Sequence, residues 1–448
     1  MQRLFGTDGI RGVAGEFPLD EATLQVIGAS LTRRFKARLG RSPRFVTGRD
    51  TRESGSRIEK AIHSGVAAKG GECESAGVFT TPGIAFLTRQ FGFDAGIVVS
   101  ASHNPFQDNG IKVFLADGRK LEEADERLIE QDIAANLVAP AHSAPCNIES
   151  PRTADFGRAY LAHFSNKFSG LSLDGLRIVV DCANGAACGF APELFSELGA
   201  DVVAINDRPT GQNINHNCGS LHLEGLQDAV ISHQAAFGAA YDGDADRALF
   251  VDEKGEVVDG DATLWILGRD LHERDRLTNN TVVATVMSNI GLELAFRSLG
   301  IALTRTAVGD KYVLDELIRS GASIGGEQSG HIIVPEEGLV GDGIMTTLLI
   351  LDVLGRSGSS LSELRRGFER YPQILVNVRV REKRSFESVS EIADAARQVE
   401  SELDGTGRLL LRYSGTENLA RVMIEGPDQQ VINEQAHRLA SVIEASLG

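Results

Sequence analysis

One pattern recurs three times along the chain: a short β-rich apolar run, then a segment with helical spacing, then a second β-rich run. It is found from "RFVTGRD" to "CESAGVF" (44–79), from "LRIVVD" to "DVVAIN" (176–206), and from "NTVVATV" to "IALTRTAVGD" (280–310). Short apolar runs that alternate with helix-period segments are typical of α/β layers. The sequence therefore predicts three similar α/β domains, each with a mixed sheet between helices.

Each copy also contains a run of small apolar residues that breaks into a polar loop. These are "AGIVV" into "SASHNP" (95–105), "AAFGAAY" into "DGDADR" (235–247), and "GASIG" into "GEQSGH" (321–331). In open α/β sheets, ligands bind at the carboxyl ends of the strands, where loops are free of the sheet ladder. We therefore expect these three loops to carry the chemistry, in a cleft between the domains.

Shifts in composition divide the chain into four predicted domains. The segment 136–153 has three prolines and no periodicity, so it reads as a linker, and 252–261 is a turn-rich join. A capping-box pattern, "SLSE", predicts a helix from Ser360 that runs to Pro372. The residues beyond it, two β-rich stretches with two helical ones, predict a smaller α+β domain. The predicted domains are 1–150, 151–255, 256–371 and 372–448.

Composition and charge exclude several classes of function. The 448 residues are 42% hydrophobic and 24% charged, as in soluble globular proteins. A net charge of −17 argues against nucleic acid as the main partner. We find no signal peptide and no membrane span, so we expect a cytoplasmic protein with no membrane partner. The five cysteines lack C-x-x-C spacing, which predicts small buried thiols rather than a disulfide framework or a zinc site.

The loop "DGDADR" places Asp242, Asp244 and Asp246 at alternate positions, so their carboxylates can converge on one hard divalent cation. An EF-hand is excluded because Arg247 replaces the required glycine and the flanks read as strands. A solvated acidic turn is the other reading; we favour one magnesium ion per chain. Magnesium also takes phosphate oxygen as a ligand, which Ser102 of "SASHNP" would provide if it carried a phosphate.

Two further loops offer polar groups suited to a sugar phosphate. "GEQSGH" presents Glu327, Ser329 and His331 between glycines, a set that can hydrogen-bond sugar hydroxyls, although a capped turn explains it nearly as well. "RYSGTEN" presents a guanidinium beside hydroxyls and backbone amides that can form an anion site. Its residues are Arg412, Ser414, Gly415 and Thr416.

Six motifs in this order resemble those of the α-D-phosphohexomutase superfamily, and the resemblance covers essentially the whole chain. They are "FGTDGIRG" (5–12), "GRDTRESG" (48–55), "SASHNP" (100–105), "DGDADR" (242–247), "GEQSGH" (326–331) and "SGTEN" (414–418). The start "LFGTDGIRGVAG", the runs "VATVMSNIGLELA" and "TAVGDKYV", and above all "GGEQSGH", are most similar to the bacterial members that act on glucosamine phosphates. Members that act on mannose or glucose phosphates are the alternative, and a non-catalytic sugar-phosphate sensor is the alternative from another class.

The resemblance implies a role for each motif residue. Ser102 would be phosphorylated in the resting enzyme, and Asp242, Asp244 and Asp246 would hold magnesium together with a phosphoserine oxygen. The residues expected near the transfer, where they help move protons or charge, are Lys112, Arg11 and His331. Glu327 and Ser329 would bind sugar hydroxyls, and Arg247 would face the substrate. The phosphate that is not reacting would be held by Arg412, Ser414, Gly415 and Thr416.

The implied reaction converts glucosamine 6-phosphate to glucosamine 1-phosphate through a 1,6-bisphosphate, on the way to bacterial envelope amino sugars. A hexosamine phosphate is then the expected partner, and glucose or glucosamine 1,6-bisphosphate is a candidate activator. The sequence does not decide the oligomeric state; a homodimer is one candidate.

Three residues depart from the pattern common in the superfamily, namely Ala245, Tyr413 and Asn418. They bear on the geometry of two loops and remove no expected ligand.

Overall fold

The structure, a computed structural model, describes residues 3–135, 152–414 and 417–448. Its contacts divide into two compact units, the first made of 1–287 with 304–365 and the second of 288–303 with 366–448. In the part of the chain that is described, no helix is long and apolar enough to cross a membrane. Most of the predicted linker, 136–151, lies outside the described residues.

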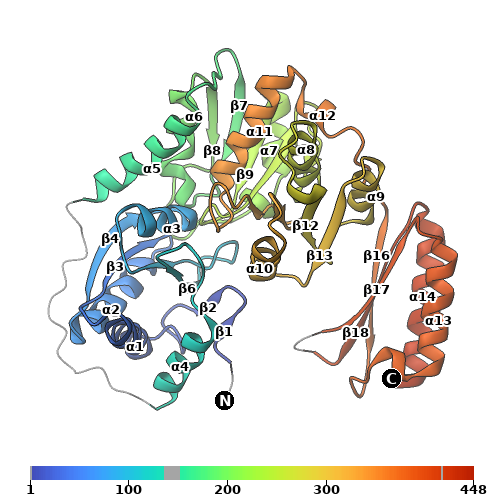
Figure 1. The fold of residues 1–448 in the computed structure, drawn as a ribbon, viewed down its shortest axis with the longest axis horizontal. Coiled ribbons are helices and arrows are strands. Elements are labelled where there is room, and N and C mark those ends of the chain that lie inside the picture. The colour runs from blue at the N-terminus through green and yellow to red at the C-terminus, as the bar shows by residue number, and fades with distance from the viewer. Residues whose placement is uncertain (1–2, 136–151, 415–416) are drawn as a thin grey trace. The chain divides into compact units, whose positions relative to one another are not determined.

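The first sheet of the larger unit is mixed, as predicted (Figure 1). Its strand order is β1-β2-β6-β5-β3-β4; β3 runs parallel to β4 and β5, and the other pairs are antiparallel. The strands are β1 (Phe5–Gly6), β2 (Gly9–Val13), β3 (Arg44–Arg49), β4 (Glu72–Val78), β5 (Ala95–Val99) and β6 (Asp108–Leu115). The helices that go with this sheet are α1 (Glu21–Leu39), α2 (Gly55–Ala68), α3 (Thr81–Gln90) and α4 (Glu123–Ala134).

Alternation along these strands explains why helices cover both faces of the sheet. Phe45 and Ile97 point to one face, where they join the apolar side chains of α1, α2 and α4 in a single core. On the opposite face, Gly48 and Gly96 let α3 approach closely, because a Cβ at either position would collide with Ile84. Burial on both faces leaves the strand ends as the place for polar residues.

The second sheet has the order β11-β10-β9-β7-β8, in which β7 is parallel to β8 and β9, and β10 is antiparallel to β9. Its strands are β7 (Arg177–Asp181), β8 (Asp201–Ile205), β9 (Phe237–Tyr241), β10 (Ala248–Asp252) and β11 (Val257–Val258). Its helices are α5 (Thr153–Lys167), α6 (Ala191–Glu197) and α7 (Glu224–Ser232). Short 3₁₀ helices occur at Ala186–Gly189, Gly219–Leu221, Thr278–Asn280 and Phe386–Ser388.

The third sheet, of order β13-β12-β14-β15, is again mixed. Its strands are β12 (Thr281–Thr285), β13 (Ala302–Thr306), β14 (Gly325–Gly326) and β15 (Ile332–Ile333). The helices of this part of the larger unit are α8 (Gly260–Glu273), α10 (Asp310–Ser320), α11 (Gly343–Ser357) and α12 (Leu361–Leu364). The three polar loops follow directly on β5, β9 and β14, which is the placement that the sequence predicted.

The smaller unit is the predicted α+β fold. Its antiparallel sheet has the order β16-β18-β17, and α13 and α14 pack on one face of it (Figure 1). Its elements are α9 (Ile290–Ser298), β16 (Gln373–Arg379), α13 (Ser390–Leu403), β17 (Arg408–Tyr413), β18 (Leu419–Glu425) and α14 (Gln429–Leu447). The fully buried Glu425 ties α9 into this unit, because its carboxylate accepts from the backbone amide of Ile290 at 3.1 Å.

One predicted helix is much shorter than expected. The capping box at Ser360 is present, but α12 ends at Leu364 rather than continuing to Pro372. Gly367 has φ 97, a left-handed conformation that an α-helix cannot contain, so the backbone turns before the proline is reached.

Of the described cysteines, Cys182 and Cys218 are buried, as expected, whereas Cys73 and Cys188 are half-buried; all four are free thiols. The four domain boundaries remain a prediction.

The packing of α1 on α2 generates a stability prediction. A Cβ at Gly65 would lie 2.0 Å from the backbone oxygen of Gln25, which cannot move away as a side chain could. We therefore expect Gly65→Ala to reduce the free energy of unfolding by about 1–3 kcal/mol, despite the better helix propensity of alanine. Thermal unfolding measures it, with Gly225→Ala in α7 as the control, because no atom lies within 4 Å of a Cβ there. Equal unfolding midpoints for the two variants would contradict the packing argument.

Candidate active site

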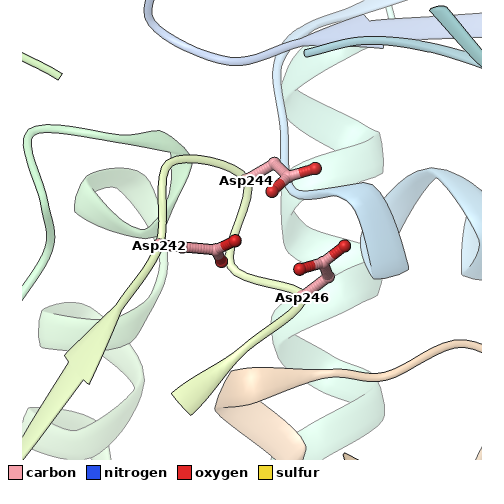
Figure 2. A group of neighbouring side chains, drawn as sticks. All are labelled: Asp242, Asp244 and Asp246. Atoms are coloured by element: carbon pink, nitrogen blue, oxygen red, sulfur yellow. The ribbon is translucent and has the colours of Figure 1, made fainter. Parts of the chain in front are cut away.

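Three carboxylates converge in the loop between β9 and β10. The ligand oxygens of Asp242, Asp244 and Asp246 all lie within 4.8 Å of one another, and the three residues are buried (Figure 2). The bend that brings them together depends on Ala245, which adopts φ 57. A left-handed conformation costs a non-glycine residue roughly 1–2 kcal/mol, so the loop holds a strained alanine at this position.

The donor atoms of this cluster fit a hard divalent cation. Among the described residues, Asp244 Oδ1 and Asp246 Oδ1 are buried without a hydrogen-bond partner. Buried carboxylate oxygens normally have partners, and oxygen ligands, carboxylates among them, are what hard divalent cations take. The cluster is therefore suited to hold a divalent cation.

The three carboxylates differ in electrostatic environment. Burial and the neighbouring charges of Asp246 and Asp244 raise the pKa of Asp242 well above its usual value. Burial opposes ionisation of Asp246 too, but Lys112, His331 and Arg247 together hold its pKa well below the usual value. A cation bound here would relieve the repulsion among like charges that burial makes strong.

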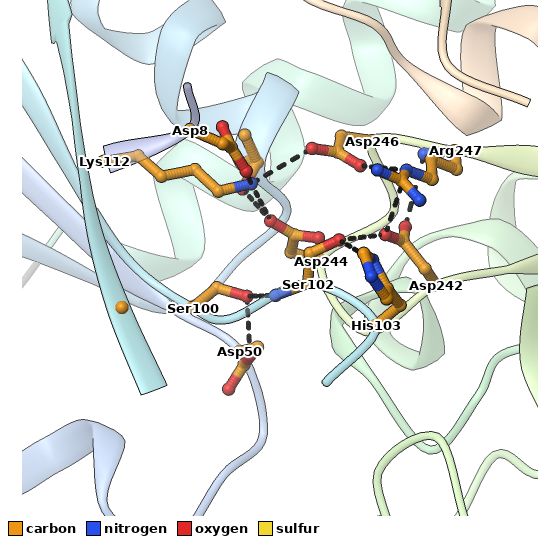
Figure 3. Close-up of polar contacts among 12 residues, drawn as sticks. Asp8, Asp50, Ser100, Ser102, His103, Lys112, Asp242, Asp244, Asp246 and Arg247 are labelled. Atoms are coloured by element: carbon orange, nitrogen blue, oxygen red, sulfur yellow. Dashed lines mark hydrogen bonds and ion pairs between the residues drawn. The ribbon is translucent and has the colours of Figure 1, made fainter. Parts of the chain in front are cut away.

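Ser102 lies beside this cluster, in the loop between β5 and β6. Its Oγ is 2.5 Å from Asp242 Oδ2 and 3.3 Å from Nδ1 of His103, and the residue is 1% exposed (Figure 3). Burial together with Arg247 and Arg11 lowers the pKa of His103 to about 4, so its ring is neutral near pH 7. The structure thus brings together the predicted phosphoserine and the predicted metal ligands, from two different sheets.

Lys112, on β6, is a buried cation rather than a surface charge. Its Nζ lies 2.9 Å from Asp244, 3.1 Å from Asp246 and 3.0 Å from Asp8 (Figure 3). Burial alone would lower the pKa of Lys112, but these carboxylates raise it well above its usual value. The lysine therefore stays charged and offsets part of the negative charge of the cluster.

A cavity of about 460 Å³ opens next to Ser102 and the carboxylates. Of the predicted site residues, its walls contain Asp246, Arg11, Arg247, Glu327 and His331. Ser329 is not one of the described residues that line it, although its buried Oγ has no hydrogen-bond partner in the described part of the chain. The volume suits a small polar ligand, since pockets for such molecules span roughly 300–1,000 Å³.

The ring of His331 is held in one orientation. The backbone amide of Gly341 donates to its Nε2 at 3.2 Å, while Nδ1 faces Asp246 Oδ1 at 3.7 Å. The neutral ring must then carry its proton on Nδ1. Burial disfavours the charged ring, but Asp246, Asp310 and Glu327 outweigh this and raise the pKa of His331.

Three charged residues at the cavity were not predicted as site residues from the sequence. They are Asp8 and Asp310, which line it, and Lys120, which pairs with both. Lys120 Nζ lies 2.5 Å from both Asp8 and Asp310, and this bridge joins segments from two sheets. Despite its burial, the charges of Lys112 and Lys120 hold the pKa of Asp8 far below its usual range. Asp8 belongs to "FGTDGIRG" and Asp310 to "TAVGDKYV", so both motifs carried a signal, whereas Lys120 lies outside the quoted motifs.

The predicted phosphate loop belongs to the smaller unit. Arg412 is the penultimate residue of β17, which ends at Tyr413 just before Ser414, whereas Gly415 and Thr416 lie outside the described residues. Arg412 stands directly opposite Arg421 in the antiparallel pair, and Lys383 donates to the backbone oxygen of Ser414 at 2.7 Å. Like charges placed opposite each other on neighbouring strands destabilise a sheet, so this arrangement favours a bound anion.

Family models match four consecutive parts of the chain. The phosphoglucomutase/phosphomannomutase domains I, II and III match residues 2–138, 158–255 and 259–371, and the C-terminal domain of that family matches 375–442. The chain therefore belongs to the phosphoglucomutase/phosphomannomutase family, which confirms the resemblance to the α-D-phosphohexomutases.

Curated relatives extend the comparison over the full length. The chain is 49% identical to the phosphoglucosamine mutase of Solibacter usitatus, covering 99% of both chains. It is 46% identical to the phosphoglucosamine mutase of Syntrophotalea carbinolica, covering 100% of this chain and 98% of that protein.

Solved structures share the fold. A phosphoglucomutase/phosphomannomutase family protein from Burkholderia thailandensis superposes with a TM-score of 0.80 at 23% identity, covering 100% of this chain and 98% of that one. The Aspergillus fumigatus N-acetylphosphoglucosamine mutase, solved in complex with GlcNAc-6P and magnesium, gives a TM-score of 0.65 at 20% identity, covering 99% and 96%.

The carboxylate cluster generates a prediction about metal binding. Asp244→Asn replaces a carboxylate by a neutral amide, a weaker ligand for a hard cation. We expect magnesium to bind at least about 10-fold more weakly by titration calorimetry, and kcat to fall about 100-fold or more. Asp201→Asn, which removes an exposed carboxylate on β8, is the charge-matched control. Unchanged magnesium affinity in Asp244→Asn would remove the loop as the metal site.

Proposed function

We propose that this chain is a phosphoglucosamine mutase that interconverts glucosamine 6-phosphate and glucosamine 1-phosphate. The observation that carries the proposal is the position of Ser102 Oγ, 2.5 Å from Asp242 in the carboxylate cluster and next to a cavity lined by Arg11, Arg247 and His331. A serine beside a site for a divalent cation, with two guanidinium groups on the adjoining cavity wall, suits phosphoryl transfer. The curated relatives that match the full chain are phosphoglucosamine mutases.

The proposed cycle begins with phosphate on Ser102. The bond from phosphorus to Ser102 Oγ breaks, a new bond forms to O1 of glucosamine 6-phosphate, and the proton of that hydroxyl passes to a base in the cavity. Ser102 Oγ takes up a proton as it leaves phosphorus. The resulting 1,6-bisphosphate turns over, the bond from phosphorus to O6 breaks, and a new bond forms to Ser102 Oγ. In this second transfer the hydroxyl proton of Ser102 passes to the base and O6 takes up a proton, which releases glucosamine 1-phosphate. Atoms and charge balance over the two transfers, so no further reactant is consumed.

The residues around Ser102 supply position and charge. Magnesium held by Asp242, Asp244 and Asp246 would stabilise charge on the transferring phosphoryl group. Arg247 is half-buried and lines the cavity, and its Nε lies 4.0 Å from Asp242 Oδ2 and 3.8 Å from Asp246 Oδ1. Its guanidinium therefore stands between the carboxylate cluster and the cavity, where it can bind a substrate oxygen. His331 lines the same cavity wall, and Glu327 accepts a hydrogen bond there from the backbone amide of Gly309 at 3.0 Å.

In each half-reaction the phosphate that is not transferred needs an anchor. We assign this role to Arg412 and Ser414 with Gly415 and Thr416, as the sequence suggested, and add Arg421 and Lys383 as neighbouring cations. The opposed pair Arg412 and Arg421 supports the assignment, because an anion between them would remove their repulsion.

The enzyme also needs a metal ion and a way to regain the phosphate on Ser102. We propose that one magnesium ion serves each chain in the cytoplasm, and that glucose or glucosamine 1,6-bisphosphate restores the phosphate on Ser102 when it is lost. The magnesium in the Aspergillus enzyme supports the first part. A homodimer remains a prediction.

Ser102→Ala tests the covalent step. The change removes one oxygen and no core volume, so the variant should fold normally, while mutase activity should fall by at least about 10³-fold. Intact-mass spectrometry of the wild type should show a species about 80 Da heavier that the variant lacks. Ser64→Ala on α2 is the control. Near wild-type turnover in Ser102→Ala would refute the mechanism.

Arg412→Ala tests the anchor. An anchor binds its phosphate equally in the ground state and the transition state, so its loss should appear mainly in KM. A hydrogen bond to a charged group contributes roughly 1.5–3 kcal/mol, which predicts a KM about 10- to 150-fold higher. Arg397→Ala on the exposed face of α13 should leave KM unchanged. If KM is unchanged in Arg412→Ala as well, the anchor lies elsewhere, with Arg421 the next residue to replace.

A further inference from the structure

Arg52 is a buried arginine whose guanidinium is enclosed by the backbone of the phosphoserine loop. It follows β3 in the motif "GRDTRESG", and its side chain is fully buried. Its Nη2 donates to the backbone oxygens of Ser102 at 2.9 Å and Asn104 at 2.8 Å. Its Nη1 donates to the backbone oxygens of Asp108, at 3.0 Å, and Pro105. Three of these carbonyls belong to the loop that carries Ser102 and the fourth, of Asp108, begins β6, so the guanidinium holds the loop against the start of that strand.

The same motif also holds the amide side of Ser102. The backbone N–H of Ser102 donates to Ser100 Oγ at 2.9 Å, and that hydroxyl donates to Asp50 Oδ2 at 2.6 Å (Figure 3). Asp50 accepts in turn from Arg52 Nε at 2.9 Å. Asp50 and Arg52 thus fix both hydrogen-bonding groups of the Ser102 backbone, one directly and one through Ser100.

This matters because Ser102 does not adopt an ordinary conformation. Its φ is 54, in the left-handed region, which an unsupported serine would leave. Its carbonyl also accepts from Asn215 Nδ2 at 2.8 Å, and a Cβ at Gly243 of the metal loop would lie 2.6 Å from that carbonyl oxygen. The backbone of Ser102 is therefore enclosed between Arg52, Asn215 and the metal loop, and this enclosure sets the direction of Oγ toward Asp242.

We infer that Arg52, paired with Asp50, is a positioning residue for phosphoryl transfer: it holds Ser102 in the strained conformation that aims Oγ at the carboxylate cluster. The inference rests on the proposed function, since it takes Ser102 as the phosphorylated residue. Arg52 is not one of the described residues that line the cavity of about 460 Å³ proposed to bind the sugar phosphate. Its loss should consequently slow transfer and leave substrate binding nearly unchanged.

The test uses the full-length enzyme with glucose 1,6-bisphosphate as the phosphoryl donor. Dephosphorylated wild type, Arg52→Lys and Arg52→Ala are mixed with the donor, and phosphate gained by Ser102 is followed by intact mass over time. We expect both variants to gain phosphate about 10- to 100-fold more slowly than wild type, with kcat reduced in parallel and KM within about 3-fold. Lysine keeps the charge beside Asp50 but lacks the planar fork that reaches four carbonyls, so it should not rescue the rate.

Two further variants keep the outcome unambiguous. Arg49→Ala lies in the same motif but breaks a pair with the buried Glu59 on α2, so it should lower the unfolding midpoint without changing the phosphorylation rate. Ser100→Ala removes the bond from the Ser102 amide and the bond to Asp50 but keeps Arg52, and it should slow phosphorylation about 10-fold. This variant carries the test if the Arg52 variants fail to fold.

The outcomes separate this inference from the proposed function. If wild type gains no phosphate from the donor, the proposed function fails and the inference fails with it. If wild type is phosphorylated and Arg52→Lys matches its rate, charge alone suffices and the positioning role is wrong. A KM that rises as much as kcat falls would also overturn it, because Arg52 would then act on binding.

Discussion

The arrangement of the site depends on burying three aspartates of one short loop beside Ser102. Asp242, Asp244 and Asp246 are nearly inaccessible to solvent, and carboxylates so close together repel strongly where the dielectric constant is low. The protein offsets this with Lys112, itself buried, whose Nζ contacts Asp244, Asp246 and Asp8. Removing one partner of such a cluster leaves an uncompensated buried charge. The repulsion that remains favours a bound cation, and in the proposed function that cation is what makes Ser102 reactive.

In each of the three sheets of the larger unit, site residues follow the carboxyl end of a strand. Ser102 follows β5, the aspartates follow β9 and Glu327 follows β14, each at the carboxyl end of a strand buried on both faces. Loops at this end have no ladder partner, so their residues can be selected for chemistry. The overall charge of −17 does not prevent the binding of an anion, because Arg11 and Arg247 place two guanidinium groups on the cavity wall, beside the carboxylates of Asp246 and Glu327.

Much of this site could be predicted from the sequence because it is encoded in short contiguous motifs that follow apolar runs. The loops at Ser102 and Asp242 were found in that way, and so was the role of the strand ends. Lys120 could not be predicted, because it lies outside these motifs and its partners Asp8 and Asp310 are 112 and 190 residues away. Two-residue strands such as β14 (Gly325–Gly326) are too short for a periodicity to reveal them, and α12 is ended by a backbone turn at Gly367 that the capping box did not foretell.

The proposed substrates are glucosamine phosphates, but a mutase for mannose or glucose phosphates would use the same catalytic groups. The most direct measurement is kcat/KM for the purified enzyme with magnesium on glucosamine 6-phosphate, glucose 6-phosphate and mannose 6-phosphate under one set of conditions. We predict that glucosamine 6-phosphate exceeds each of the other two by at least about 10-fold, which corresponds to about 1.4 kcal/mol of preferential transition-state binding. A kcat/KM on glucose or mannose 6-phosphate equal to or above that on glucosamine 6-phosphate would contradict the assignment.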